Sequence, residues 1–281
     1  MTMELFEKIC AEYAEIGGGF LGFSPLLADP LLDPLLLERI RLIYKNYKNI
    51  HPHMFTNGIA FPRFSDKELI EILSALDHID ISIGGLNSSD YKTMFGVDQF
   101  EKVKKSLYRL SDLNKQYSCN CKLGLHIRTH KKQKALNSLE LKELINQGYK
   151  CNDILDYFSD WGGLVTAEDL PEGANLIKQD NSNCKVPCLI PMTYMTIMPD
   201  GRVLGCGCMD GKEDTYVGHL DNSNLQEIWK GKEFTDLRNS FREGKPFPLC
   251  QTCSFYREYE DFFCRPGFKD FTPSKNFWEC I

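Results

Sequence analysis

The stretches CLIPMTYMTIMPDGRVLGC, residues 188–206, and PLCQTC, residues 248–253, decide how the C-terminal part of this chain folds. Their cysteines follow the frame C-x12-G-x4-C and, after a long gap, C-x2-C, with Gly201 as the glycine of an Asp-Gly turn. Four thiolates from two hairpin-like segments suit a tetrahedral zinc ion or a four-iron cluster. The sequence therefore predicts a metal centre whose ligands are Cys188, Cys206, Cys250 and Cys253.

The choice between zinc and iron rests on the spacing of these cysteines. Four cysteines alone bind zinc more often than a cluster, and a fold with free thiols and no metal is a further alternative. The first pair is, however, too widely spaced for an ordinary zinc knuckle, and an α/β segment precedes it. We therefore expect an iron–sulfur cluster and keep zinc as the alternative.

Composition and charge limit the classes of protein to which this chain can belong. The chain has 281 residues, of which 42% are hydrophobic, and its formal net charge of −6 does not favour a nucleic-acid groove. No apolar run reaches the roughly 18 residues of a membrane helix, and the acidic start does not resemble a signal peptide. Twelve cysteines in such a chain indicate reduced thiols and metal ligation. We expect a cytoplasmic protein with neither nucleic acid nor membrane as a partner.

About the first 165 residues alternate helix-like and strand-like segments, which predicts a parallel sheet covered by helices. The expected helices are residues 2–16, 33–47, 66–76, 98–115 and 138–147. The expected strands are residues 20–27, 53–55, 79–83, 123–127 and 157–164. A polar stretch over residues 167–187 is expected to be a linker.

The cysteine frame and the text around it resemble the SPASM/twitch domain, the cysteine-rich extension of radical SAM enzymes. The resemblance runs from Cys188 to about Tyr256 and includes Gly218-His219-Leu220 and Ile228-Trp229 in an expected helix. It implies a small α+β domain over residues 184–281, in which the four cysteines named above bind an auxiliary [4Fe-4S] cluster.

A second cluster is the alternative that the remaining cysteines leave open. Cys208, Cys264 and Cys280 are its candidate ligands, and Cys184 is a candidate bystander. The family's two-cluster form has a short spacing after C-x2-C, whereas ten residues separate Cys253 from Cys264 here. This break favours one cluster.

Residues 1–183 resemble the partial (β/α)6 TIM-like barrel of radical SAM enzymes, without its first strand. Ser24-Pro25-Leu26-Leu27-Ala28-Asp29-Pro30 stands where the family has a Gly-Glu-Pro-like motif, and Thr56-Asn57-Gly58 resembles the end of the third strand. Ile81-Ser82-Ile83-Gly84-Gly85-Leu86 resembles the fourth strand. The resemblance implies a pocket for S-adenosylmethionine that is lined by Asp29, Asn57, Ser82 and Arg128.

Three of these residues also have a structural interpretation. Asp29 is a candidate helix cap, Asn57 a residue of an Asn-Gly turn, and Arg128 a surface charge. His51, His53 and His126 have a spacing that suits strand faces better than a metal site.

The sequence lacks the C-x3-C-x2-C signature whose thiolates hold the catalytic cluster of radical SAM enzymes. Cys184 and Cys188 have the first spacing only, because Pro191 stands at the third position. We expect a chain that is truncated at its N-terminus or begins at an internal methionine. A degenerate relative is the alternative, and Ala28 and Gly84, which replace a usual glycine and aspartate, favour it.

The expected function is that of the C-terminal portion of a radical SAM/SPASM oxidoreductase or maturase. The parent would cleave S-adenosylmethionine to a deoxyadenosyl radical that abstracts hydrogen from a substrate. The alternative is a non-catalytic iron–sulfur protein for electron transfer or interaction, or a zinc-binding module. The substrate, a peptide, sugar or other small molecule, is not specified, and an electron donor is an expected partner.

We predict that this chain alone forms no deoxyadenosine from S-adenosylmethionine, because no cysteine triplet in it matches the ligands of the catalytic cluster. The measurement is chromatographic detection of deoxyadenosine after anaerobic reconstitution with iron and sulfide and chemical reduction. Turnover above that of a heat-inactivated sample contradicts the prediction.

Overall fold

The structure is a computed structural model, and it describes residues 1–24, 28–177, 179–207 and 209–258. The chain divides into two compact units. The sheet unit comprises Phe6–Phe158 and Ala167–Asn175, and the cysteine unit comprises Met1–Leu5, Ser159–Thr166 and the chain from Leu176 onward. Each unit has its own buried cluster of hydrophobic side chains.

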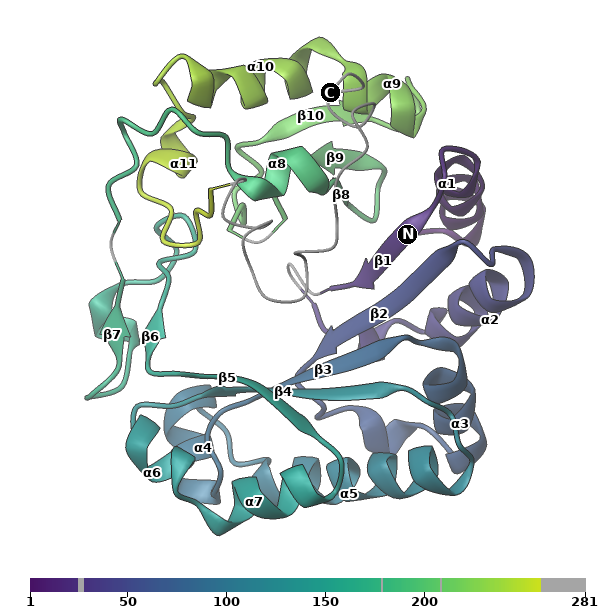
Figure 1. The fold of residues 1–281 in the computed structure, drawn as a ribbon, viewed down its shortest axis with the longest axis vertical. Coiled ribbons are helices and arrows are strands. Elements are labelled where there is room, and N and C mark those ends of the chain that lie inside the picture. Colours follow the sequence, from purple (N-terminus) through teal and green to yellow (C-terminus); the bar gives the residue numbers. More distant parts are fainter. Residues whose placement is uncertain (25–27, 178, 208, 259–281) are drawn as a thin grey trace, which may run out of the picture. The chain divides into compact units, whose positions relative to one another are not determined.

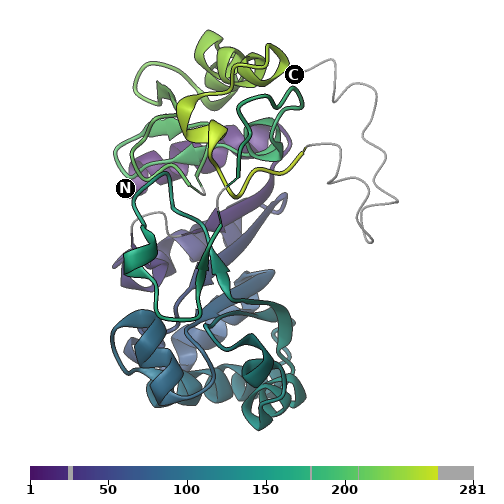
Figure 2. The same cartoon turned by 90° about the vertical axis from the view of Figure 1, so that its left-hand side faces the viewer.

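Five parallel strands form the sheet unit. They are β1 (Gly19–Phe23), β2 (Ile50–Thr56), β3 (His78–Ile83), β4 (Lys122–Arg128) and β5 (Lys150–Leu155). They pair in chain order, β1-β2-β3-β4-β5, and every pair is parallel. Figures 1 and 2 show this order as a colour change from purple to teal across the sheet. The α/β fold class predicted from the sequence is confirmed.

Helices connect the strands. Those up to residue 146 are α1 (Met3–Glu15), α2 (Leu36–Asn46), α3 (Asp66–Ala75), α4 (Ser88–Phe95), α5 (Phe100–Gln116), α6 (Lys132–Leu136) and α7 (Leu139–Asn146). Short 3-10 turns occupy Pro30–Leu32, Phe61–Arg63 and Ala167–Asp169. Helix α3 begins at a capping box, in which Ser65 and Glu68 each accept the other's backbone N–H. No described helix is long and apolar enough to cross a membrane.

The core lies between the sheet and these helices. Ile79, Ile81 and Ile83 of β3 are buried in one cluster with apolar residues of α2, α3, α5 and α7. Because side chains alternate along a strand, His78, Asp80 and Ser82 point to the opposite face of the sheet. That face is therefore free to carry polar groups.

The predicted position of the fifth strand is wrong. The sequence favoured residues 157–164, whereas β5 occupies Lys150–Leu155 and residues 161–164 form a turn. Strand β5 was missed because Asn152 and Asp153 interrupt its apolar pattern, and these side chains instead bond polar groups on β3 and β4. Helices α4 and α6 were not predicted, and residues 25–27 of the first expected strand lie outside the described residues.

A polar network covers the sheet face that points away from the helices. His126 of β4 lies between two carboxylates, with Nδ1 2.8 Å from Asp153 Oδ2 and Nε2 3.4 Å from Asp80 Oδ1. Asn152 Nδ2 donates to Asp80 Oδ1 at 2.6 Å. Gly124 leaves room for this pair, because a Cβ there would lie only 1.9 Å from Asp80 Oδ1. The network therefore links β3, β4 and β5 through side chains as well as backbone.

The histidines of this face differ in charge. Burial is the main cause that lowers the pKa of His53 to about 4, and His78, stacked on it with ring centroids 4.5 Å apart, contributes to the same shift. Burial also favours the neutral form of His126, but hydrogen bonds to Asp153 and Asp80 outweigh it and raise the pKa of His126 to about 9. Near neutral pH the face thus holds a neutral His53 beside a cationic His126.

The cysteine unit contains a small antiparallel sheet of β8 (Thr196–Ile197), β9 (Arg202–Leu204) and β10 (Tyr216–His219), in the order β10-β9-β8. Its helices are α8 (Leu189–Thr193), α9 (Leu225–Lys230), α10 (Lys232–Arg242) and α11 (Pro248–Gln251). Figure 1 shows α9 and α10 beside β10. At the end of the sheet unit, the short strands β6 (Tyr157–Phe158) and β7 (Asn175–Leu176) pair with each other.

We predict that His126 makes the free energy of unfolding depend on pH between about 6.5 and 9. Its folded pKa lies above its ordinary value of 6.5, so its stabilisation is fully present below pH 6.5 and is lost as the pH rises through 9. The measurement is urea unfolding across this window, followed by circular dichroism. His53 acts oppositely, because its protonation destabilises the fold as the pH falls from 6.5 toward 4.

The variant His126→Gln should flatten the alkaline part of this profile. His51→Gln is the control, because the His51 side chain is half-exposed and its contact with Asp77, 3.3 Å away, is a surface ion pair of small energy. An alkaline profile that is unchanged in His126→Gln contradicts the prediction.

Candidate metal centre

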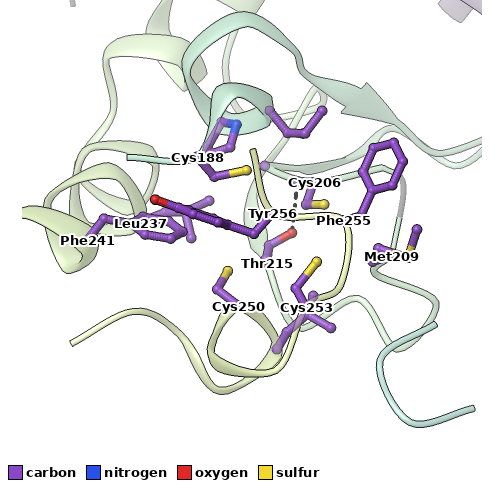
Figure 3. Close-up of a pocket in the computed structure, with 14 residues that line it drawn as sticks. Cys188, Cys206, Met209, Thr215, Leu237, Phe241, Cys250, Cys253, Phe255 and Tyr256 are labelled. Atoms are coloured by element: carbon purple, nitrogen blue, oxygen red, sulfur yellow. Dashed lines mark hydrogen bonds between the residues drawn. The ribbon is translucent and has the colours of Figure 1, made fainter. Parts of the chain in front are cut away.

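Four cysteine side chains surround one cavity in the cysteine unit. Cys188, Cys206, Cys250 and Cys253 all line it, and Figure 3 shows their sulfur atoms arranged around the same space. The cavity measures about 440 Å³, including its mouth. Within the described ranges, no three His, Cys, Asp or Glu side chains are close enough to hold a single metal ion. The thiols enclose a space and do not converge on a point.

Each cysteine is placed by a different local element. Cys188 precedes α8, Cys206 follows β9, Cys250 lies in α11 and Cys253 lies just beyond it. The turn that joins β8 to β9 depends on Gly201, which has a φ of +96° and donates its N–H to Met198 O at 3.0 Å. This hairpin delivers Cys206 to the cavity, as the Asp-Gly turn in the sequence suggested.

Apolar side chains form the rest of the wall. Leu237 and Phe241 of α10 and Leu249 of α11 are buried there. The Tyr256 ring stacks on Phe241 with centroids 6.0 Å apart, and its hydroxyl donates to Val186 O at 2.8 Å. A wall of this kind excludes water and lowers the local dielectric around the sulfur atoms.

This environment disfavours ionisation of the thiols. Burial raises the pKa of Cys250 well above its ordinary value, and the nearby Cys206, Cys188 and Cys253 raise it further. Burial likewise raises the pKa of Cys253 to about 11. Because metal ligands are thiolates, the cavity favours four ionised cysteines only with positive charge at its centre.

Backbone N–H groups oppose part of this effect. Burial raises the pKa of Cys188, but hydrogen bonds from the backbone of Arg257 and Ile190 lower it. Burial is also the largest effect on Cys253, and backbone hydrogen bonds from Phe255 and Tyr256 act against it. Hydrogen bonds to sulfur are among the factors that set the reduction potential of a cluster.

A buried carboxylate holds the loop that follows Cys206. Asp210 is fully buried and accepts the backbone N–H groups of Asp214 at 2.7 Å and Thr215 at 2.8 Å. Thr215 Oγ1 in turn accepts the Cys206 N–H at 3.0 Å. Asp210 and Thr215 therefore fix the backbone at Cys206, and no motif in the sequence pointed to them.

A buried arginine supports the other side of the cavity. The guanidinium of Arg238 lies 4.0 Å from the Trp229 ring centroid and 4.1 Å from that of Phe234. It donates to Pro191 O at 2.9 Å and to Trp229 O at 2.8 Å, and burial lowers its pKa to about 10. Trp229 therefore belongs to the frame of the cysteine unit, and Arg238 connects α9 and α10 to the wall residue Pro191.

The polar stretch before Cys188 is not a linker along its whole length. The sequence favoured a linker over residues 167–187, but Asn181 is 1% exposed and bonds the C-x2-C segment. Its Nδ2 donates to Cys250 O at 3.0 Å and to Cys253 O at 2.8 Å. Sequence reasoning missed Asn181 because no local pattern distinguishes it from the exposed Asn183, two residues further along the same polar run.

The other cysteines of this region are only partly described. Cys184 is half-buried and packs against the cluster of Cys188, Phe241 and Tyr256. The candidate ligands of a second cluster, Cys208, Cys264 and Cys280, lie outside the described residues.

The residues expected to line a cofactor pocket lie at one edge of the sheet unit. Asn57 follows β2, Ser82 lies near the end of β3, and Arg128 ends β4. These strands are parallel neighbours, so their carboxyl ends share an edge. Asp29 is joined to this edge, because its carboxylate accepts the Thr56 hydroxyl and the Asn57 N–H, each at 2.8 Å.

These side chains differ in how many of their hydrogen-bonding groups are already used by other protein groups. Asp29 Oδ1 also accepts the Leu31 N–H at 3.0 Å, so protein donors already surround the carboxylate. Asn57 Oδ1 accepts the Ile59 N–H at 2.9 Å within its turn. The guanidinium of the half-buried Arg128 has no hydrogen bond or ion pair with another described residue, and burial lowers its pKa against the attraction of Asp153. Arg128 therefore has unused donors for an anionic ligand.

Known proteins resemble both parts of the chain. Residues 188–254 match the SPASM family, an iron–sulfur cluster-binding domain. The fold is similar to that of BtrN in complex with AdoMet and 2-DOIA, with a TM-score of 0.58 and 16% identity over 92% of this chain and 82% of that chain. It is also similar to native anSMEcpe with bound AdoMet and Cp18Cys peptide, with a TM-score of 0.55 and 16% identity over 92% and 82% of the two chains. No curated protein matches the sequence.

Proposed function

We propose that the four clustered cysteines bind an auxiliary [4Fe-4S] cluster. Residues 188–254 match a SPASM domain, and the fold is similar to that of radical SAM enzymes with such a domain. The observation that carries the proposal is the arrangement of four cysteine side chains, one buried and three half-buried, around one cavity. A donor set of thiolates alone fits such a cluster. The proposed ligands are Cys188, Cys206, Cys250 and Cys253.

The chain's own residues would serve the cluster in two ways. Leu237, Phe241 and Tyr256 would keep water from the sulfur atoms, and backbone N–H groups of Phe255 and Arg257 would offset part of the thiolate charge. When bound, the cluster supplies a one-electron redox centre whose irons all have protein ligands. It would therefore act in electron transfer or as a structural group.

We further propose that the carboxyl edge of the sheet unit binds S-adenosylmethionine in a cytoplasmic oxidoreductase. BtrN and anSMEcpe, which share this fold, are both bound to AdoMet. The unused guanidinium of Arg128 is suited to the cofactor's carboxylate, and Asp29, Asn57 and Ser82 would line the remainder of the pocket. Cleavage of the cofactor to a deoxyadenosyl radical, which would abstract hydrogen from a substrate of unspecified class, requires one electron from a reduced catalytic cluster, and the C-x3-C-x2-C ligands of that cluster are absent from this sequence.

Two alternatives have support from the sequence. An iron–sulfur protein that transfers electrons or binds a partner without radical chemistry agrees with the lack of a C-x3-C-x2-C triplet. A zinc-binding module agrees with the four cysteines alone. Analysis of the iron, sulfide and zinc content distinguishes the zinc-binding module from the two iron–sulfur proposals.

We predict that the chain, reconstituted anaerobically with iron and sulfide, binds about four irons and four sulfides. The variant Cys250→Ala should lose most of this iron and the visible absorption of the cluster, because it removes one of four ligands. The measurements are iron, sulfide and zinc analysis with visible spectroscopy.

Cys119→Ala is the matched control, because Cys119 is a half-buried cysteine of the sheet unit. Its iron content should equal that of the wild type. Stoichiometric zinc without sulfide would assign the cavity to zinc. An iron content in Cys250→Ala equal to that of the wild type would show that Cys250 is not a ligand.

We predict that Arg128→Ala weakens S-adenosylmethionine binding by roughly 10- to 100-fold, the range expected for a lost hydrogen bond to a charged group. The measurement is calorimetric titration at millimolar cofactor. Lys122→Ala is the control, because Lys122 is an exposed cation at the opposite end of the same strand, β4. Equal affinities of the two variants contradict a role for Arg128.

A further inference from the structure

The turn that carries Cys250 and Cys253 is bonded by a buried asparagine from another segment, Asn181. We propose that Asn181 is a positioning residue for the metal centre, which fixes the C-x2-C turn relative to the segment that carries Cys188. The inference rests on the proposed cluster site. Asn181 lies in the stretch that the sequence presented as a linker, seven residues before Cys188.

Asn181 satisfies three backbone carbonyl groups of this turn. Its side-chain Nδ2 donates to Cys250 O at 3.0 Å and to Cys253 O at 2.8 Å, which uses both of its N–H bonds. Its backbone N–H donates to Gln251 O at 2.7 Å. One residue therefore contacts both ligands of the C-x2-C pair and the residue after the first.

The Cys250 and Gln251 carbonyl groups need a donor from outside α11, whereas Cys253 O lies beyond the helix and also accepts the Tyr256 N–H at 3.3 Å. Helix α11 has only four residues, Pro248–Gln251, so all its carbonyl groups belong to a final turn that lacks intrahelical partners. The Asn181 side chain acts as the cap of this turn. Because Asn181 is 1% exposed, water cannot replace it without opening the structure.

Asn181 also directs the chain toward Cys188. Its carbonyl oxygen accepts the Cys184 N–H at 2.9 Å, which closes a turn at the start of the segment. Further along, the Leu189 N–H donates to Arg257 O at 2.8 Å, and the Tyr256 hydroxyl donates to Val186 O at 2.8 Å. Asn181 thus begins a series of bonds that runs alongside the C-x2-C segment and ends at Cys188.

The geometry has a consequence for a bound cluster. Three of the four proposed ligands, Cys188, Cys250 and Cys253, lie on the two segments that Asn181 joins. Loss of its amide would let the C-x2-C turn shift relative to Cys188. Cys250 O would lose the Asn181 donor, and Cys253 O would keep only the Tyr256 N–H at 3.3 Å. A cluster held by strained or mobile ligands dissociates faster and has altered electronic properties.

The experiment compares variants of Asn181 with the same substitutions at Asn183, which is exposed and two residues away. Each reconstituted chain is mixed with an iron chelator under anaerobic conditions, and cluster absorption is followed with time. Asn181→Ala should lose its cluster roughly 10- to 100-fold faster than the wild type, the range known for residues that support metal ligands. Asn181→Asp should lose it faster still, because a carboxylate lacks the donors, as alanine does, and also places negatively charged acceptor oxygens against the two carbonyl oxygens. Asn183→Ala and Asn183→Asp should behave as the wild type.

Two further measurements separate positioning from general stability. The midpoint potential and the electron paramagnetic resonance spectrum of the reduced cluster should change in Asn181→Ala and not in Asn183→Ala. Circular dichroism reports whether each variant is folded. If Asn181→Ala does not fold, Asn181→Ser, which keeps one donor, should fold and lose its cluster at an intermediate rate.

The outcomes distinguish this inference from the function on which it rests. A wild type that binds no iron and sulfide overturns the proposed cluster site. A wild type that binds the cluster while Asn181→Ala and Asn181→Ser release it at the wild-type rate, with an unchanged spectrum, overturns the role of Asn181 alone.

Discussion

The cysteine unit depends on one electrostatic constraint, which is that four buried or half-buried thiols share a cavity. Burial and mutual repulsion both disfavour their ionisation, as the raised pKa values of Cys250 and Cys253 indicate. A cationic centre reverses this balance, because it attracts all four thiolates at once. The apolar wall, which disfavours the metal-free thiolates, then strengthens their attraction to the metal. The same burial therefore opposes the ionised apo site and favours the loaded one.

The sequence predicted the proposed ligands of this site but not the residues that position them. Cysteines are rare and chemically distinct, so their spacing and the Asp-Gly turn at Gly201 were informative. Asn181, Asp210 and Thr215 are common polar residues, and their role comes from burial. Burial of a polar side chain in a loop depends on contacts distant in sequence, such as the 72 residues between Asn181 and Cys253. No local pattern contains that information.

Secondary structure in the sheet unit likewise could be predicted only where local sequence patterns determine it. Strands β3 and β4 were predicted because their isoleucines and leucines alternate with polar residues and are buried against helices. Strand β5 was missed because its Asn152 and Asp153 are matched to Asp80 and His126 on neighbouring strands. Strand pairing also explains Gly124, because a side chain at this position would clash with Asp80 and Asn152 of the neighbouring strands. Tertiary contacts thus overrode strand propensity at β5.

At the carboxyl edge of the sheet, residues that were grouped together from the sequence have different roles. Resemblance placed Asp29, Asn57, Ser82 and Arg128 in one group, yet their bonding differs. Asp29 and Asn57 organise the loops at the edge, because protein N–H and hydroxyl groups already occupy their oxygen atoms. Arg128 brings a partly desolvated positive charge to the end of an apolar strand. A desolvated cation gains most from an anionic partner, so specificity for a carboxylate at this edge would come from Arg128, with Asp29 holding the surrounding backbone in place.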